Sequence, residues 1–312
     1  MGQPFVRGRF EALPDVPRLP HPFFQTPLRR VLVHAAGWPP FTATVRVTGN
    51  GPPLLLVHGL MTSAYSWRYV LEGLGKHFTL YIPDLPGGGG SDAVADVAYT
   101  PAALAQVLLA LQRALNIEGC ACVANSMGGY LAMVTQLEAP TAFSRLVVVH
   151  APAVPRFRYD ALRAAWKVPG TRALFRGLVR WDPERFAFKN VHYWDETLKS
   201  LEEAREYAAP LKTDAGLESF RRYLADTMDA GALRAFHRTL VKRKSAGQRW
   251  PVPLLLLYAR RDPMVPPETG PMLHALIPDA TLTILDDASH FAHVDAVERF
   301  LPPVLAFLGV NG

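Results

Sequence analysis

The chain has 312 residues, of which 49% are hydrophobic and 19% are charged. This composition excludes an intrinsically disordered protein, which would be poor in apolar residues and rich in charge. The net charge is +6, but the basic residues are scattered and the densest stretch is only Lys242–Lys244. We therefore expect no nucleic-acid partner. No apolar run approaches the roughly 18 residues of a membrane span, and the first residues do not resemble a secretory signal.

The two cysteines, Cys120 and Cys122, are separated by a single residue. On a strand this spacing points both side chains to the same face, so it differs from a redox C-x-x-C motif. We interpret them as small buried hydrophobic residues. Because at most one bridge could form, a reducing, cytoplasmic compartment is expected.

The first 28 residues are rich in proline and phenylalanine and predict an extended arm that packs on the body of the protein. Strand-like and helix-like segments then alternate, opening with a hairpin. The predicted strands are Arg30–Ala35, Thr42–Val47, Leu54–Val57, Phe78–Ile82, Gly119–Ala124, Arg145–Val149, Leu254–Tyr258 and Thr281–Leu285. The predicted helices among them are Pro101–Leu115, Met127–Glu138, Pro267–Leu276 and Val294–Leu308.

Residues 152–247 interrupt this alternation. They hold 19 of the 33 Lys and Arg residues but only 12 of the 27 acidic ones, and they show no clear strand. The helices expected there are Tyr159–Lys167, Thr171–Val179, Thr197–Tyr207, Gly216–Met228 and Gly231–Lys244. Buried strands that alternate with helices favour an α/β fold with a mostly parallel, doubly wound sheet. We therefore predict an arm (1–28), a core (29–151 plus 248–312) and a helical cap (152–247) inserted after strand six.

Ligands of parallel sheets bind beyond the carboxyl ends of the strands. The loop after Gly119–Ala124 places Ser126 between a predicted strand and a predicted helix. A serine on such a sharp turn needs small residues two positions before and after it, and Ala124 and Gly128 meet this need. Ala124 departs from the first glycine of the G-x-S-x-G pattern. The alternative interpretation is that Ser126 is simply a helix N-cap.

The loop His58-Gly59-Leu60 follows the strand Leu54–Val57. Glycine lets the backbone approach a ligand closely, so the amide of Leu60 could join that of Met127 to hold an oxyanion. We expect a structural role for His58 itself.

Two further loops supply an acid and an imidazole. Asp262 follows the strand Leu254–Tyr258, although Asp-Pro is also common in turns. His290 follows the strand Thr281–Leu285 and is the candidate general base, with His293 as its competitor. The chain order Ser126, Asp262, His290 is that of an α/β-hydrolase triad.

Together the four loops resemble the α/β-hydrolase superfamily over roughly residues 40–310. The segment Asp84–Asp92 resembles the family's D-x-P-G-x-G-x-S-D loop, and His58-Gly59 followed by Ser66-Trp67 resembles its oxyanion segment. Asp262 with Val265-Pro266 resembles the acid loop, and the spacing from His290 to Asp295 resembles H-x-x-x-x-E. The resemblance implies Ser126 as nucleophile, Asp262 as acid and His290, not His293, as base. No motif predicts a cofactor or a metal site.

We expect a serine hydrolase that cleaves a small or medium hydrophobic carboxylic ester through an acyl-enzyme. A serine at this position argues against epoxide hydrolase and haloalkane dehalogenase chemistry, whose relatives carry aspartate there. Asn125 before Ser126 and Met127-Gly128-Gly129 after it resemble the bacterial meta-cleavage-product hydrolases, which break carbon–carbon bonds in dienoic acids. That activity is the alternative, although Leu60-Met61-Thr62 replaces the glycine-rich segment of that group. A non-catalytic relative that senses a ligand is the third hypothesis. The expected partner is a hydrophobic small molecule, and the oligomeric state stays open.

Overall fold

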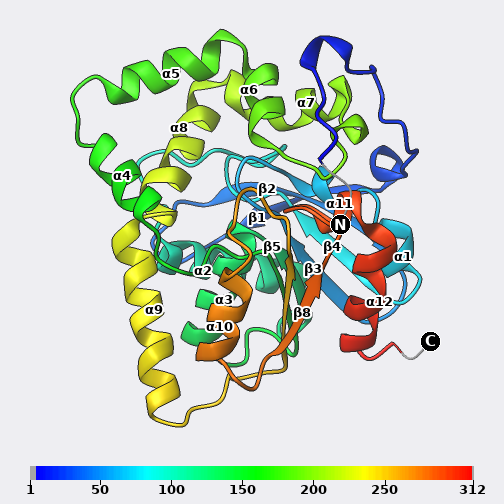
Figure 1. The fold of residues 1–312 in the computed structure, drawn as a ribbon, viewed down its shortest axis with the longest axis vertical. Helices are drawn as coiled ribbons and strands as arrows, with labels where there is room; N and C mark the ends of the chain where they lie inside the picture. Colours follow the sequence, from blue (N-terminus) through cyan, green and yellow to red (C-terminus); the bar gives the residue numbers. More distant parts are fainter. Residues whose placement is uncertain (1–4, 311–312) are drawn as a thin grey trace.

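The computed structural model describes residues 5–310, which fold around one eight-stranded sheet (Figure 1). The strand order is β1-β2-β4-β3-β5-β6-β7-β8. The first pair is the expected antiparallel hairpin, β2 also runs antiparallel to β4, and every other pair is parallel. This confirms the prediction of a mostly parallel α/β sheet. The strands are β1 (Leu28–Val33), β2 (Phe41–Gly49), β3 (Pro53–Val57), β4 (Thr79–Pro83), β5 (Ala121–Asn125), β6 (Leu146–Val149), β7 (Leu254–Ala259) and β8 (Thr281–Leu285).

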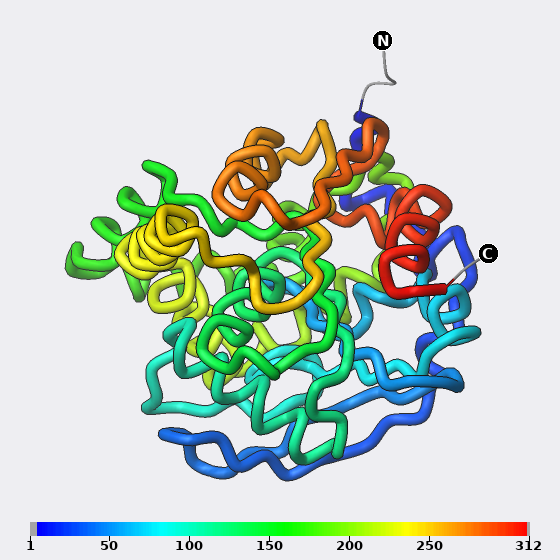
Figure 2. Tube along the Cα trace, turned by 90° about the horizontal axis from the view of Figure 1, so that it is seen from below, coloured from blue at the N-terminus to red at the C-terminus, as the bar shows by residue number. Residues whose placement is uncertain are grey.

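Helices cover both faces of the sheet because its central strands are apolar on both sides. In β3, Leu55 and Val57 belong to one apolar cluster and Leu54 and Leu56 to the other, and all four side chains are fully buried. The first cluster includes residues of α2 (Pro101–Leu115), α3 (Met127–Glu138) and α10 (Thr269–Leu276). The second includes residues of α1 (Leu71–Gly75), α11 (Ala292–Asp295) and α12 (Val297–Phe307). Seen from below, the blue hairpin strands form one end of the molecule and the orange C-terminal segments the other (Figure 2).

Between β6 and β7 the chain is helical. The helices are α4 (Phe157–Ala165), α5 (Thr171–Trp181), α6 (Pro183–Asn190), α7 (Leu201–Ala208), α8 (Asp214–Arg222) and α9 (Ala230–Ser245), with a π-helical turn at Tyr223–Thr227. Most of them lie above the sheet in the view of Figure 1. Within residues 5–310, no helix is long and apolar enough to cross a bilayer.

The sequence analysis missed two helices, α1 and α6, and merged two others. Asp182 caps α6 by accepting a hydrogen bond from the amide of Arg185 at 2.9 Å, and Pro183 occupies the first position, a pattern that the sequence already contained. The predicted helix Val294–Leu308 is instead α11 and α12. The break falls at Ala296, whose backbone (φ −142°, ψ 41°) is not helical.

The N-terminal arm packs on this helical segment. Val6 forms a bridge with Asp195, and the ring of Phe10 lies 5.7 Å from that of Phe188, centroid to centroid. The carbonyl of Pro14 accepts a hydrogen bond from the amide of Leu201 at 2.8 Å. The aromatic side chains of the arm therefore contact both layers: Phe10 packs against α6, and the ring of Phe23 lies 4.2 Å from the guanidinium carbon of Arg46 in β2.

Candidate active site

Ser126 stands at a sharp turn between β5 and α3. Its backbone has φ 54° and ψ −123°, in the positive-φ region that serine rarely adopts. The Ser126 amide donates to the carbonyl of Val149 at 2.7 Å, which ties the turn to the neighbouring strand β6. Its side chain makes no capping hydrogen bond to α3. The N-cap interpretation therefore lacks the interaction that would define it.

Glycines allow this turn to sit close to the β3 loop. A Cβ on Gly128 would lie 2.4 Å from the carbonyl oxygen of His58, and a Cβ on Gly59 would lie 2.9 Å from the Cβ of Ser126. Real Cβ atoms do not approach other atoms so closely. Gly59 and Gly128 thus bring the Leu60 loop and the start of α3 together around Ser126.

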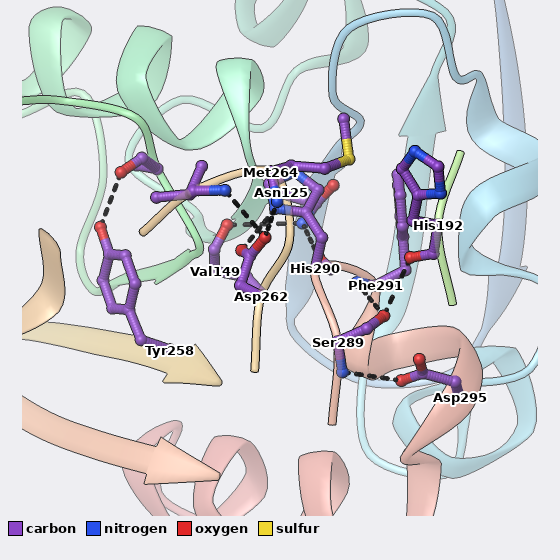
Figure 3. Close-up of polar contacts among 12 residues, drawn as sticks. Asn125, Val149, His192, Tyr258, Asp262, Met264, Ser289, His290, Phe291 and Asp295 are labelled. Atoms are coloured by element: carbon purple, nitrogen blue, oxygen red, sulfur yellow. Dashed lines mark hydrogen bonds and ion pairs between the residues drawn. The ribbon is translucent and has the colours of Figure 1, made fainter. Parts of the chain in front are cut away.

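His290 and Asp262 form a buried pair (Figure 3). The Nδ1 of His290 donates to Oδ2 of Asp262 at 2.6 Å. The other carboxylate oxygen, Oδ1, accepts the amides of Met264 and Val265 at 2.7 and 2.8 Å. Burial alone would raise the pKa of Asp262, but the neighbouring His290 and these hydrogen bonds outweigh it and lower that pKa. Because Nδ1 of His290 is bonded to Asp262, Nε2 is the ring nitrogen that can interact with another group.

His293, the competing histidine, lies elsewhere. Its ring packs against that of Trp67 with 4.3 Å between centroids, and neither ring nitrogen has a hydrogen-bond partner within the described residues. Burial holds the pKa of His293 well below the usual value.

Asp295, the last residue of the predicted histidine motif, accepts the amide of Trp194 at 2.6 Å. Burial raises the pKa of Asp295 to about 6.

A cavity of about 540 Å³ brings the other predicted site residues together. Its wall includes Leu60, Ser126, Met127 and His290. Neither the Leu60 nor the Met127 amide has a backbone or side-chain acceptor in residues 5–310. The rest of the wall is mainly apolar and comes largely from the helical segment, including Tyr159, Leu162, Phe175, Phe186, Phe220, Leu224 and Met228.

The glycine-rich loop after β4 supports this wall without entering it. His58 donates from Nδ1 to the carbonyl of Gly59 at 2.8 Å and accepts the amide of Leu85 at Nε2 at 2.9 Å. The Asp84 carboxylate accepts the amides of Ala64 and Gly90 at 2.8 and 3.0 Å. His58 therefore uses both ring nitrogens to join two loops, which matches the structural role expected for it.

Three residues that the sequence analysis did not assign belong to this site. Asn125 donates from Nδ2 to the carbonyl of His290 at 3.2 Å, so it holds the histidine loop against the serine turn. Arg158, at the start of α4, is the cationic side chain in the cavity wall. His150 follows β6 with φ 54°, and its ring centroid lies 5.4 Å from that of His290. Arg158 and His150 belong to no sequence motif, so the sequence alone could not assign them to the site. Asn125 could have been assigned, because it directly precedes Ser126.

His150, Asp262 and His290 are also a possible metal-binding group. Their donor atoms lie within 4.8 Å of one another, and all three residues are buried. Histidine and carboxylate are ligands that zinc accepts. However, a cation there would have to compete with the hydrogen bond between His290 and Asp262.

The comparison with known protein families decides the classification. A family model described as the alpha/beta hydrolase fold matches residues 52–297. The chain belongs to the α/β-hydrolase family. The recognition made from the four loops is thereby confirmed.

Relatives of this α/β hydrolase include different hydrolases. It is 28% identical over 264 residues to a 2-hydroxymuconate semialdehyde hydrolase of Pseudomonas sp. strain CF600, covering 84% of this chain and 88% of that one. It is 24% identical to a pimeloyl-[acyl-carrier protein] methyl ester esterase of Aeromonas hydrophila, covering 86% of this chain and all of that one. A meta-cleavage product hydrolase of Pseudomonas fluorescens IP01 has a similar fold, with a TM-score of 0.66, 23% identity and coverage of 91% and 98%.

The structure also accounts for the departure of this α/β hydrolase from the G-x-S-x-G pattern. Ala124 is fully buried at the end of β5, and its carbonyl oxygen would lie 3.0 Å from a Cβ on Gly129. The glycine pair 128–129 therefore supplies the close approach between α3 and the strands, and a methyl group is accommodated at position 124.

Proposed function

We propose that this protein is a serine hydrolase that cleaves a small or medium hydrophobic carboxylic ester. One observation carries the proposal: Ser126, on a strained turn and without a capping bond, shares a cavity wall with His290, whose Nδ1 is bonded to Asp262. A nucleophile, a base and an orienting carboxylate are the groups that acyl transfer requires.

In the proposed reaction, Nε2 of His290 takes the proton of the Ser126 hydroxyl as Oγ attacks the substrate carbonyl carbon. The tetrahedral intermediate then expels the alcohol, which receives that proton from His290, and an acyl-Ser126 ester remains. Water attacks this ester with His290 again as base, and the acid leaves as Ser126 regains its proton. Asp262 fixes the tautomer of His290 and stabilises the imidazolium form.

The amides of Leu60 and Met127 are the proposed oxyanion donors. Both residues line the cavity, and neither amide has an acceptor within the described residues. Met127 is also the first residue of α3, where the helix dipole favours a negative charge. Loss of one such donor typically slows a reaction about 10²–10³-fold.

The cavity wall supports a hydrophobic acyl or alcohol group. Its aromatic side chains include Phe175 and Phe220, whose rings are stacked with 5.9 Å between centroids. The volume of about 540 Å³ lies in the usual range for small-molecule sites.

Arg158 favours a second candidate, the hydrolysis of a carbon–carbon bond in a dienoic acid. Its guanidinium donates to the carbonyl of Met264 and to the hydroxyl of Tyr159, and it lines the cavity. A fixed arginine is suited to a substrate carboxylate. The similarity to the 2-hydroxymuconate semialdehyde hydrolase points the same way.

Hydrolysis assays test both candidates. Wild-type protein, Ser126→Ala and Arg158→Gln are assayed on p-nitrophenyl esters from acetyl to decanoyl and on a 2-hydroxy-6-oxo-dienoate. We expect ester turnover that falls about 10⁴–10⁶-fold in Ser126→Ala and changes little in Arg158→Gln. Preference for the dienoate, with at least a roughly tenfold loss in Arg158→Gln, would establish the second candidate instead.

A fluorophosphonate probe tests the hypothesis of a non-catalytic ligand sensor. We expect the probe to label wild-type protein at Ser126 and to leave Ser126→Ala unlabelled. Folded wild-type protein that neither turns over a substrate nor reacts with the probe would contradict the hydrolase proposal.

A further inference from the structure

A second histidine–carboxylate pair lies at the wall of the cavity. His192 lines the same cavity as Ser126 and His290, and its Nδ1 donates to Oε1 of Glu196 at 3.2 Å. Because an ionised carboxylate only accepts hydrogen bonds, Nδ1 carries the proton, and a neutral His192 presents Nε2 as an acceptor. Within residues 5–310, Nε2 of His192 has no hydrogen-bond partner, and the side chain is 30% exposed.

The buried carboxylate of Glu196 is fixed from two further sides. It accepts the amide of Gly8 at 3.0 Å and Nζ of Lys199 at 3.1 Å. Burial alone would raise the pKa of Glu196, but the Gly8 amide and the Lys199 ammonium outweigh it and lower that pKa. Glu196 is therefore ionised at neutral pH and holds the tautomer of His192.

Asn190 adds a second acceptor to this part of the wall. It is the last residue of α6, and its Nδ2 donates to the carbonyl of Phe186 at 2.8 Å. Oδ1 is then the atom of the Asn190 side chain that can interact with another group, and no described residue donates to it. Asn190 and His192 both line the cavity, whose wall is otherwise mainly apolar. Two acceptors placed in such a wall indicate a ligand that carries hydrogen-bond donors.

The segment that carries these acceptors is attached to the loop of His290. Oγ of Ser289 donates to the carbonyl of His192 at 3.1 Å (Figure 3). The amide of Trp194 donates to Asp295, beyond His290 in the chain, at 2.6 Å. In the proposed reaction His290 protonates the departing alcohol, so the alcohol part of the ester lies on the His290 side of the cavity.

We propose that His192 and Asn190 bind two hydroxyl groups on the alcohol part of the substrate, so that the preferred substrate is the monoester of a polyol. Nε2 of His192 accepts one hydroxyl, and Oδ1 of Asn190 accepts the other. The acyl chain then occupies the apolar part of the wall, which includes Phe175 and Phe220. This inference rests on the hydrolase function proposed above and narrows its substrate class.

The charge of the wall favours hydroxyl groups over a cationic donor such as an ammonium group. Among the described residues, no Asp or Glu lines the cavity, whereas Arg158 does. An ammonium group there would meet a like charge and would find no carboxylate in the wall, which makes its removal from water costly. Uncharged hydroxyl groups carry no such cost and still supply the donors that the two acceptors need.

Two esters with the same heavy-atom skeleton test the proposal. They are 2,3-dihydroxypropyl hexanoate and 2-methylbutyl hexanoate, which differ only in that two hydroxyl groups replace two methyl groups. Release of hexanoic acid gives kcat/KM for wild-type protein, His192→Phe and Asn190→Leu. The matched control is His77→Phe, because His77 is an exposed histidine outside the cavity wall. Circular dichroism establishes that each variant is folded.

We expect wild type and His77→Phe to prefer the dihydroxypropyl ester by about tenfold or more, because the alkyl ester leaves both acceptors unpaired. His192→Phe and Asn190→Leu should each lose about three- to tenfold on the dihydroxypropyl ester and nothing on the alkyl ester. A wild type without this preference would overturn the proposal. Equal losses on both esters would do so as well, because they indicate a merely structural role for His192 and Asn190.

Binding to Ser126→Ala separates this proposal from the hydrolase proposal. Isothermal titration calorimetry should show tighter binding of the dihydroxypropyl ester than of the alkyl ester, and addition of His192→Phe should remove the difference. Cleavage of the alkyl ester without any preference for hydroxyl groups would overturn the polyol inference and leave the hydrolase standing. If neither ester is cleaved, the ester-hydrolase proposal fails, and the calorimetry still decides whether the two acceptors bind a polyol ester.

Discussion

The ring of His150 lies against that of His290, with 5.4 Å between centroids and 36° between the ring planes. His150 is fully buried, neither of its ring nitrogens has a partner within the described residues, and its backbone has positive φ. Burial, helped by the nearby His290 and opposed by Asp262, lowers the pKa of His150 to about 3. A neutral imidazole thus borders the pair that we propose for catalysis.

His150 should make stability depend on pH. Its pKa is about 3 in the folded chain and near 6.5 when unfolded, so the unfolded chain binds the extra proton. The stabilisation is complete above pH 6.5 and is lost as the pH falls toward 3. His150→Asn, which tolerates positive φ, should reduce the slope of unfolding free energy against pH by up to about 1.4 kcal/mol per pH unit between pH 6.5 and 4. Urea unfolding at several pH values measures this slope, and equal slopes for the two proteins would contradict the assignment.

Asp262→Asn tests the orienting carboxylate. An amide can donate to Nδ1 of His290 and favour the wrong tautomer, so kcat should fall about 10⁴-fold. Asp295→Asn is the matched control, because Asp295 is a half-buried carboxylate near His290 that accepts the amides of Trp194 and Ser289 instead. We expect its kcat to stay within a few-fold of wild type. A similar loss in both variants would indicate damage to the loop and not a role specific to Asp262.

Two helical glycines should respond oppositely to alanine. In α3, the Cβ of Gly128→Ala would lie 2.4 Å from the carbonyl oxygen of His58, so the turn must shift. We expect a loss of about 1–3 kcal/mol in unfolding free energy together with lower activity. In α5, a Cβ on Gly177 meets nothing within 4 Å, so Gly177→Ala should gain about 0.5–1 kcal/mol. Thermal unfolding of both variants checks the signs, and a stabilised Gly128→Ala would refute the packing argument.

The buried ion pair between Arg68 and Glu203 should matter far more than a surface pair. Both side chains are almost inaccessible, and Glu203 also accepts the hydroxyl of Tyr193 at 2.7 Å. Glu203→Ala leaves Arg68 charged and unpaired, which should cost about 3–5 kcal/mol. Asp286→Ala removes the exposed partner of Arg260 and should cost less than about 1 kcal/mol. Denaturant unfolding compares the two, and a small effect of Glu203→Ala would show that water reaches Arg68.

Much of the fold could be predicted because periodicity and strand-end positions are local signals. Ser126, Asp262 and His290 each follow a predicted strand, so a parallel sheet brings their loops to one edge. His150 follows a strand as well, but nothing in the surrounding residues separates a buried histidine beside the site from an ordinary core residue. Its neighbour His290 is 140 positions away, and only the strand order β6-β7-β8 brings the two rings together. The break between α11 and α12 at Ala296 could not be predicted either, because the apolar pattern of the sequence continues across it.

The contacts of the arm also constrain the order in which the chain can assemble. The amide of Gly8 bonds the carboxylate of Glu196 across a sequence separation of 188 residues. During synthesis, the arm leaves the ribosome before α6 and α7 and cannot make these contacts until they have followed. Closing so long a loop carries a large entropic cost, so it should come after local structure has formed. The residues of the arm are therefore synthesised long before their partners and reach their final positions late in folding.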